Sequence, residues 1–268
     1  MGQGRANPVT LAALGVLAYI AETMLHEAGG HGLVCLATGG RIALLAPLFM
    51  RCSVVTPWMV AAGPAANALA AAASLLALYR MRSDAWRYFF WLSFVFNALV
   101  MCGYLLVGAA TGFGDWAVLF AGVAPDWAWR LPAGIAALAL YGQALKLASR
   151  AFVAVTALGR PSIAARARLI LIPTGAAALV ALAAEFQGGR TAPMALALAF
   201  GCTLFVGLTL MGVGDGNAGR KLCESRLRLP LRVPAVILAA LLAAGFVLVV
   251  GPGVPLTDKQ VAIRGRSG

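Results

Sequence analysis

Charged residues are scarce in this chain: Asp, Glu, Lys and Arg make up 11% of its 268 residues, whereas hydrophobic residues make up 62%. A soluble protein needs about 25% charged residues, so the composition excludes a soluble globular enzyme. Apolar stretches of the ~20 residues that cross a bilayer recur along the whole sequence, which excludes a soluble domain with one anchor. Disorder, coiled coil and collagen are excluded as well. We therefore expect an all-α polytopic membrane protein.

Acidic residues are fewer than basic ones, and the net charge is +12. Such an excess would suggest nucleic acid in a soluble protein, but here the basic residues lie in short loops between apolar stretches. We expect no nucleic-acid partner and take the lipid bilayer as the surroundings. The basic residues are almost all Arg, and Ala and Gly are abundant. This usage is typical of a GC-rich bacterial genome and favours the bacterial inner membrane.

Cysteine spacing gives no recognisable motif. The five cysteines are odd in number and lack CxxC pairs, so the sequence implies neither a disulfide framework nor a cysteine zinc cluster. We expect them to be small buried hydrophobic residues. They are Cys35, Cys52, Cys102, Cys202 and Cys223.

Seven apolar stretches predict about seven transmembrane helices. They cover residues 9–36, 58–79, 86–109, 128–149, 167–186, 192–213 and 232–251. The first is too long for a signal-peptide core and is expected to be retained. Fourteen of the 21 Lys and Arg residues lie on the N-terminal side and seven on the other. By the positive-inside rule the N-terminus is cytoplasmic.

Three regions follow from this pattern. Residues 1–127 would form a core of three helices and a broken segment, residues 128–251 four further helices, and residues 252–268 a loose polar tail. Residues 42–55, interrupted by Pro47 and Arg51, are too short to cross the membrane and predict a β-hairpin at its surface. Residues 110–127 contain three Gly and one Pro and predict a broken or re-entrant segment, which must be buried in protein or line a cavity.

Ionisable side chains inside a span are costly and mark functional sites. The first span contains Glu22, His26, Glu27 and His31, and the two histidines are the only ones in the chain. The segment His26-Glu27-Ala28-Gly29-Gly30-His31 resembles the zinc motif HExxH, in which two His bind the metal and Glu is the general base, but has one residue more. Two unrelated polar residues packing on other helices are the alternative.

The extra residue has a geometric consequence. In a regular α-helix, positions i and i+5 point about 140° apart, so two imidazoles could not reach one ion. A π-bulge returns them to one face, and Gly29-Gly30 is where the backbone most easily accepts it. We therefore predict a π-bulge or break between Glu27 and His31. A soluble dipeptidyl-peptidase family has the same HExxGH form.

The second span begins with Ala61-Ala62-Gly63-Pro64-Ala65-Ala66-Asn67. The chain therefore has, in this order, a His-Glu motif, a glycine pair at Gly39-Gly40, a surface hairpin and an AGPxxN-like motif. The same order is found in the site-2 protease family of intramembrane zinc metalloproteases. The first 115 residues or so resemble that family.

The resemblance implies Zn²⁺ bound by His26 and His31, with Glu27 as catalytic base. It also implies that Gly63, Pro64 and Asn67 line the cleft that receives a membrane-protein substrate in regulated intramembrane proteolysis. Asn67 is equally suited to hydrogen bonds between helices, as is Asn97.

The family takes its third zinc ligand from an Asp in a Leu-Asp-Gly context, which this chain lacks. Asp215 precedes Gly, as in that motif, but the topology places Asp115 on the side of the histidines and favours it. Asp115 could instead cap a helix. Glu22, one turn before His26, could orient a ligand imidazole, pair within its own helix or replace Asp115 as ligand.

Two functions remain open. The first is an intramembrane zinc metallopeptidase that cuts membrane-spanning substrates. The alternative is a non-proteolytic membrane protein on the same scaffold, such as another metal-dependent hydrolase, a transporter or a partner subunit that keeps the metal site. The sequence carries no signal for the oligomeric state.

Overall fold

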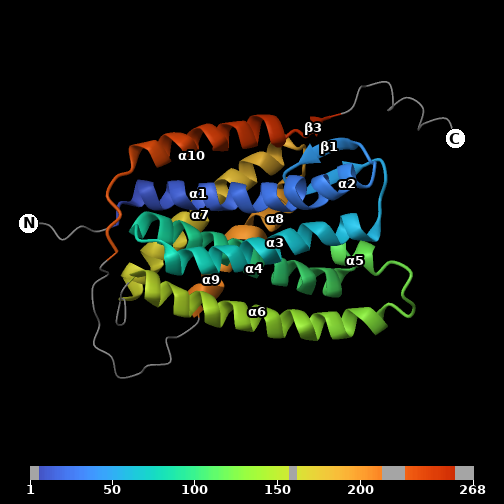
Figure 1. Cartoon of the computed structure of the whole chain (residues 1–268), viewed down its shortest axis with the longest axis horizontal. Helices are drawn as coiled ribbons and strands as arrows, with labels where there is room; N and C mark the ends of the chain where they lie inside the picture. The colour runs from blue at the N-terminus through green and yellow to red at the C-terminus, as the bar shows by residue number, and fades with distance from the viewer. Residues whose placement is uncertain (1–5, 157–161, 213–226, 257–268) are drawn as a thin grey trace, which may run out of the picture.

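The computed structural model describes residues 6–156, 162–212 and 227–256. Within these ranges seven helices are long and apolar enough to cross a membrane, as predicted, and they run side by side in one bundle (Figure 1). They span Pro8–Ala37, Pro57–Arg80, Asp84–Thr111, Trp127–Thr156, Ile163–Gln187, Met194–Gly212 and Val233–Val250. The chain is an all-α integral membrane protein with a small sheet.

The first span consists of three consecutive helical segments. These are α1 (Pro8–Met24), the π-helix η1 (Leu25–Gly32) and α2 (Leu33–Ala37). The span begins where the side chain of Asn7 accepts a hydrogen bond from the backbone N–H of Val9 at 2.9 Å, with Pro8 at the first helical position. The predicted π-bulge between Glu27 and His31 is confirmed as a π-helix of eight residues.

The other spans follow in chain order. They are α3 (Pro57–Arg80), α4 (Asp84–Thr111), α6 (Trp127–Thr156), α7 (Ile163–Gln187), then α8 (Ala192–Ala199), η2 (Phe200–Leu204) and α9 (Phe205–Gly212), and last α10 (Val233–Gly245) with η3 (Phe246–Val250). Helix α1 packs against α4, α7 and α10, and α4 also contacts α3 and α6.

Buried aromatic side chains on α4 hold the bundle together. The hydroxyl of Tyr88 donates to the carbonyl of Leu169 on α7, and the indole N–H of Trp91 donates to the carbonyl of Ala148 on α6 at 2.9 Å. Both rings are fully buried. Their polar atoms are thus paired inside an apolar interior, where an unpaired group would be costly.

The predicted hairpin is present as β1 (Ile42–Ala46) and β2 (Phe49–Cys52). A third strand, β3 (Val254–Pro255), pairs with β1 at Leu44 and Leu45, so the strand order is β2-β1-β3. The expectation of a loose tail after residue 251 is therefore wrong for β3. The last span ends beside β1, and the backbone of β3 pairs with the open edge of that strand. Residues 257–268 lie outside the described part of the chain.

A disulfide joins Cys35 on α2 to Cys52 on β2, with a Cα–Cα distance of 6.0 Å. The expectation that the cysteines are isolated hydrophobic residues is wrong for this pair, because the hairpin folds back over α2. Cys102 is a buried free thiol, as expected, and Cys202 is a partly buried one. Cys223 lies outside the described residues.

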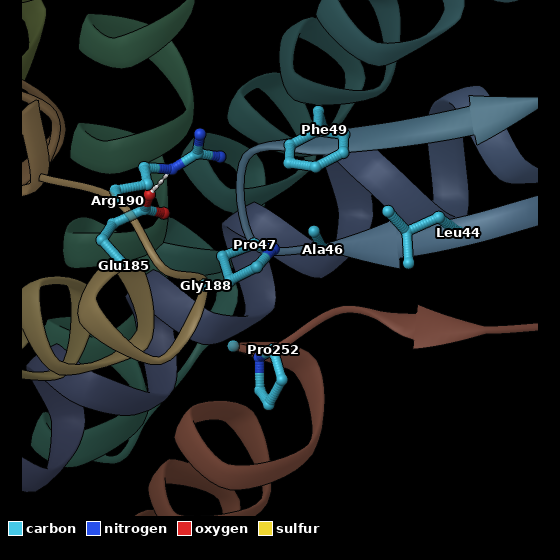
Figure 2. Close-up of a pocket in the computed structure, with 9 residues that line it drawn as sticks. Leu44, Ala46, Pro47, Phe49, Glu185, Gly188, Arg190 and Pro252 are labelled. Carbon is cyan, nitrogen blue, oxygen red and sulfur yellow. Dashed lines mark hydrogen bonds and ion pairs between the residues drawn. The ribbon is translucent and has the colours of Figure 1, made fainter.

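The hairpin tip is held by an ion pair near the end of α7. The guanidinium of Arg190 pairs with the buried carboxylate of Glu185 and lies over the ring of Phe49, 5.3 Å from its centre (Figure 2). The hairpin is therefore fixed at its tip by α7 and at its base by the disulfide. The end of the bundle opposite the N-terminus carries the hairpin, β3 and the short helix α5 (Asp115–Leu119) (Figure 1).

The break predicted within residues 110–127 is also present. Helix α4 ends at Thr111 and is capped by Gly112, whose φ is +72°; Gly114 follows with φ +90°. Residues with side chains rarely adopt these values. The chain then starts α5 at Asp115, and α5 packs against α3 and α4.

Candidate metal centre

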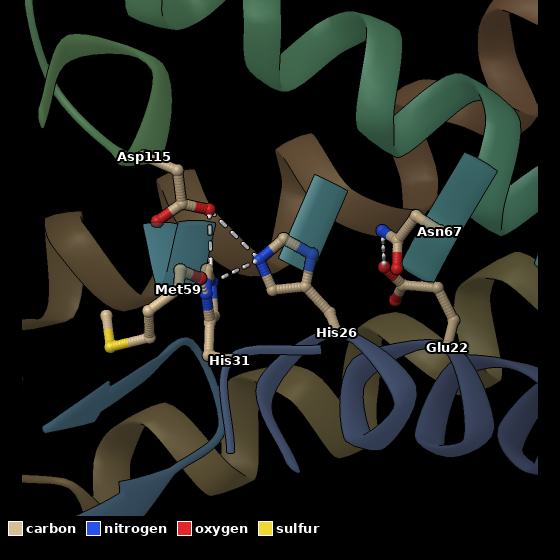
Figure 3. A network of polar contacts seen from close by, with 6 residues as sticks. All are labelled: Glu22, His26, His31, Met59, Asn67 and Asp115. Atoms are coloured by element: carbon tan, nitrogen blue, oxygen red, sulfur yellow. Dashed lines mark hydrogen bonds and ion pairs between the residues drawn. The ribbon is translucent and has the colours of Figure 1, made fainter. Parts of the chain in front are cut away.

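Three ligand atoms from two distant segments converge at one point. The Nε2 atoms of His26 and His31 are 3.2 Å apart, and Oδ2 of Asp115 lies 3.1 Å from the first and 3.3 Å from the second (Figure 3). A tetrahedral zinc ion with bonds of ~2.0–2.1 Å separates its ligand atoms by ~3.3–3.4 Å. The three atoms thus have the spacing of three corners of such a site.

The π-helix brings the two histidines to one face. Their rings lie edge to face with centroids 4.8 Å apart, although the two residues are five positions apart in sequence. The additional residue per turn in η1 therefore compensates for the additional residue in the motif.

The contact of His31 with Met59 directs its second ring nitrogen at Asp115. Its Nδ1 lies 2.8 Å from the carbonyl oxygen of Met59, which accepts only, so the hydrogen of a neutral His31 is on Nδ1. Its Nε2 then presents a lone pair toward the Asp115 carboxylate. A lone pair and a carboxylate 3.3 Å apart repel each other, and either a proton on Nε2 or a metal ion between the two atoms removes that repulsion. The donor set of two imidazoles and a carboxylate fits zinc.

Asp115 is the carboxylate that the structure places with the histidines. Burial alone would raise the pKa of its carboxyl, but the contacts with His26 and His31 outweigh burial and lower that pKa to about 2. The side chain is therefore ionised at neutral pH, as a metal ligand must be. Asp215, the alternative from its Gly context, lies outside the described residues.

Gly63 and Gly30 allow α3 to pass directly against the π-helix. A Cβ at Gly63 would lie 2.4 Å from Nε2 of His31 and 2.7 Å from Nε2 of His26, and a Cβ at Gly30 would lie 2.6 Å from the carbonyl oxygen of Ala62. Both positions therefore exclude a side chain. The glycine of the AGPxxN motif leaves space for the two imidazoles, and Pro64 follows it, buried within α3.

Glu27 lies in the same π-helix and is 4% exposed. Its Oε2 atom is buried without a hydrogen-bond partner among the described residues. Leaving such an acceptor unpaired costs ~1–3 kcal/mol. A carboxylate oxygen left free next to two candidate metal-ligand histidines is suited to accept a proton from water.

Glu22 contacts Asn67 and not an imidazole. Asn67 Nδ2 donates to Glu22 Oε1 at 3.1 Å, and the hydroxyl of Thr23 donates to Oε2 at 3.2 Å. In Figure 3 the ring of His26 lies between this pair and Asp115. The pair ties α1 to α3, whereas the amide of Asn97 donates to the Ser93 carbonyl in its own helix.

Sequence reasoning missed Tyr104. This side chain lies on α4, and its ring is edge-on to that of His26 at a centroid distance of 6.4 Å. Its one signal in the sequence was its position two turns before the end of the span that leads to Asp115.

Comparison with known families, with curated proteins and with solved structures finds no match for this chain. Its functional assignment therefore depends on the motifs and on the geometry of the site.

Proposed function

We propose that this chain is an intramembrane zinc metallopeptidase, similar to the site-2 protease family, that hydrolyses peptide bonds in membrane-spanning proteins. The observation that carries the proposal is the group of His26, His31 and Asp115 at tetrahedral spacing. This group lies beside the unpaired carboxylate of Glu27, within a bundle of membrane-spanning helices.

The residues fit a hydrolytic site. His26, His31 and Asp115 would hold zinc with one position left open, as in catalytic sites. Zinc bound there supplies a Lewis acid that lowers the pKa of water toward neutrality. Glu27 removes a proton from the attacking water and delivers it to the leaving amine as the C–N bond breaks. The side chains of His26 and Asp115 are 13% and 23% exposed, which leaves the site reachable.

The sheet offers a place for the substrate. A transmembrane helix must unwind before its backbone can be cut, because its amide groups are bonded within the helix. Strand β1 is paired on both sides, whereas β2 has β1 as its partner. The outer edge of β2 can therefore add an unwound substrate strand by backbone hydrogen bonds.

The disulfide supports the proposed orientation. Disulfides persist in oxidising compartments, such as the bacterial periplasm, and are rare in the cytosol. The Cys35–Cys52 bond lies at the end of the bundle opposite the N-terminus. Together with the distribution of Lys and Arg, it favours a cytoplasmic N-terminus and a metal centre near the outer face of the bacterial inner membrane.

The test uses the full chain purified in detergent. We expect one zinc per chain and cleavage of a helical transmembrane peptide that stops when a chelator is added. Glu27→Gln should keep the zinc and abolish cleavage, since the three ligands are intact. Turnover by Glu27→Gln would reject the mechanism. Zinc binding without cleavage of transmembrane peptides by the wild type would favour the non-proteolytic alternative.

A further inference from the structure

Tyr104 is a polar side chain at the metal centre that the reaction described above does not use. It reaches the site from α4, and its ring lies edge-on to His26. Its hydroxyl lies beside Gly114, the residue that precedes the candidate third ligand.

The position of this hydroxyl is fixed by the connection after α4. A Cβ at Gly114 would lie 2.5 Å from the Tyr104 oxygen, so a side chain at that position is excluded by Tyr104 as well as by its φ of +90°. The phenol is thus held against the chain segment that carries the third ligand.

The hydrogen of this hydroxyl has no acceptor within residues 6–156, 162–212 and 227–256. A phenol both donates and accepts, so this hydroxyl is available to donate to a ligand at the metal centre.

Building on the proposed peptidase function, we infer that Tyr104 is a catalytic residue that donates a hydrogen bond to the oxyanion of the tetrahedral intermediate. When the water oxygen bonds to the carbonyl carbon, the π electrons of the C=O bond move to its oxygen, which becomes negatively charged. Tyr104 keeps its proton and stabilises this charge, which returns to the carbonyl when the C–N bond breaks. Fixed donors of this kind act without reorganisation, because they are in place before the charge develops.

A purely structural role would give a different result. If Tyr104 served to hold the Asp115 segment, its loss would displace a ligand and weaken zinc binding. If it serves the oxyanion, its loss leaves zinc binding intact and slows the chemical step.

The experiment compares Tyr104→Phe with Tyr141→Phe in the full chain. Tyr141 is the matched control because its hydroxyl contacts Thr209, 3.0 Å away, and no metal-centre residue. Three quantities are measured: kcat and KM for a transmembrane peptide, zinc per chain, and the affinity of a phosphinic peptide, whose tetrahedral oxygens imitate the intermediate. For Tyr104→Phe we expect kcat to fall about 100-fold, as for loss of one oxyanion donor, with KM and zinc unchanged and phosphinic-peptide affinity lowered. Tyr141→Phe should match the wild type.

An unchanged kcat, or zinc lost in parallel with kcat, would overturn the inference. If the wild type binds zinc but cuts no peptide, the proposed function fails, and the phosphinic peptide still decides the role of Tyr104. Equal affinity of that peptide for wild type and Tyr104→Phe overturns the inference, and weaker affinity for Tyr104→Phe supports it.

Discussion

His31 donates its Nδ1–H to the carbonyl oxygen of Met59 across 2.8 Å, which joins the π-helix to the first turn of α3. That turn is fixed in its own right, because the side chain of Thr56 accepts from the backbone N–H of Met59 at 3.1 Å. Metal-ligand histidines commonly donate their second nitrogen to such an acceptor, which sets tautomer and ring orientation. The close approach of η1 and α3 therefore belongs to the candidate metal centre.

The first prediction uses two neighbouring glycines to test the close packing of η1 against α3. Gly30→Ala would place a methyl 2.6 Å from both the Ala62 carbonyl oxygen and the Cα of Gly63, whereas at Gly29 the nearest atom would be Leu25 Cδ2 at 3.6 Å. Overpacking of this kind costs ~1–3 kcal/mol. We expect Gly30→Ala to lower the melting temperature and weaken zinc binding, and Gly29→Ala to leave both near wild type. Competition with a chromophoric chelator measures the zinc affinity.

The same effect from both alanines would contradict this packing, since it would mean that the π-helix rejects any side chain along its length.

The second prediction concerns the third ligand. Asp115→Ala removes the carboxylate that lies beside both histidines. Loss of a residue that only hydrogen-bonds to a metal ligand lowers metal affinity ~10–100-fold, so loss of the ligand Asp115 should lower zinc affinity by more. Asp126→Ala is the matched control, because Asp126 is exposed in the same connection between α4 and α6. Both affinities are measured by chelator competition on purified protein.

Asp215→Ala should also retain zinc, because the predicted topology puts Asp215 across the membrane from His31. Loss of zinc in that variant, with zinc kept in Asp115→Ala, would identify Asp215 as the ligand and invert the sixth span.

Hydropathy and local motifs account for much of this structure. The seven spans follow from apolar length, and the π-helix follows from two histidines five residues apart that must share one face. The hairpin follows from the position of Pro47 and Arg51 in a stretch too short to cross. Each of these features depends on residues close together in sequence.

Features created by the arrangement of helices were not predictable. The Cys35–Cys52 bond exists because the hairpin folds over α2, and β3 exists because the last span ends beside β1. Tyr104 belongs to no motif and reaches His26 through the crossing of α4 over the first span. The motif glycine Gly63 was identified by resemblance, but its physical role requires knowing that the imidazole Nε2 atoms lie where its side chain would be.

The third prediction separates a structural from a ligand role for Glu22. Glu22→Ala removes the acceptor for the buried Asn67 amide, and a buried donor without a partner costs ~1–3 kcal/mol. Glu22→Gln keeps a carbonyl oxygen at the same place. We expect a lower melting temperature for Glu22→Ala, a smaller change for Glu22→Gln and wild-type zinc affinity in both. A zinc affinity that falls in both variants would make Glu22 a ligand or a partner of one.

The last prediction tests the orientation through the disulfide. In a chain whose other cysteines are alanines, Cys35→Ser leaves Cys52 as the one thiol, and Cys52 is partly exposed on β2 at the end of the bundle opposite the N-terminus. A membrane-impermeant maleimide added to intact spheroplasts should label Cys52. A tag at the N-terminus should become accessible to protease only after the spheroplasts are lysed. The control is the same chain with Cys52→Ser, which should stay unlabelled. Labelling that requires lysis, with the tag accessible beforehand, would place the metal centre on the cytoplasmic side and reverse the assignment made from Lys and Arg.

The disulfide also contributes to stability. It closes a loop with a sequence separation of 17 residues, and a loop of that size is worth about 3 kcal/mol in the chain-entropy estimate. Cys35→Ser should therefore lower the melting temperature under oxidising conditions.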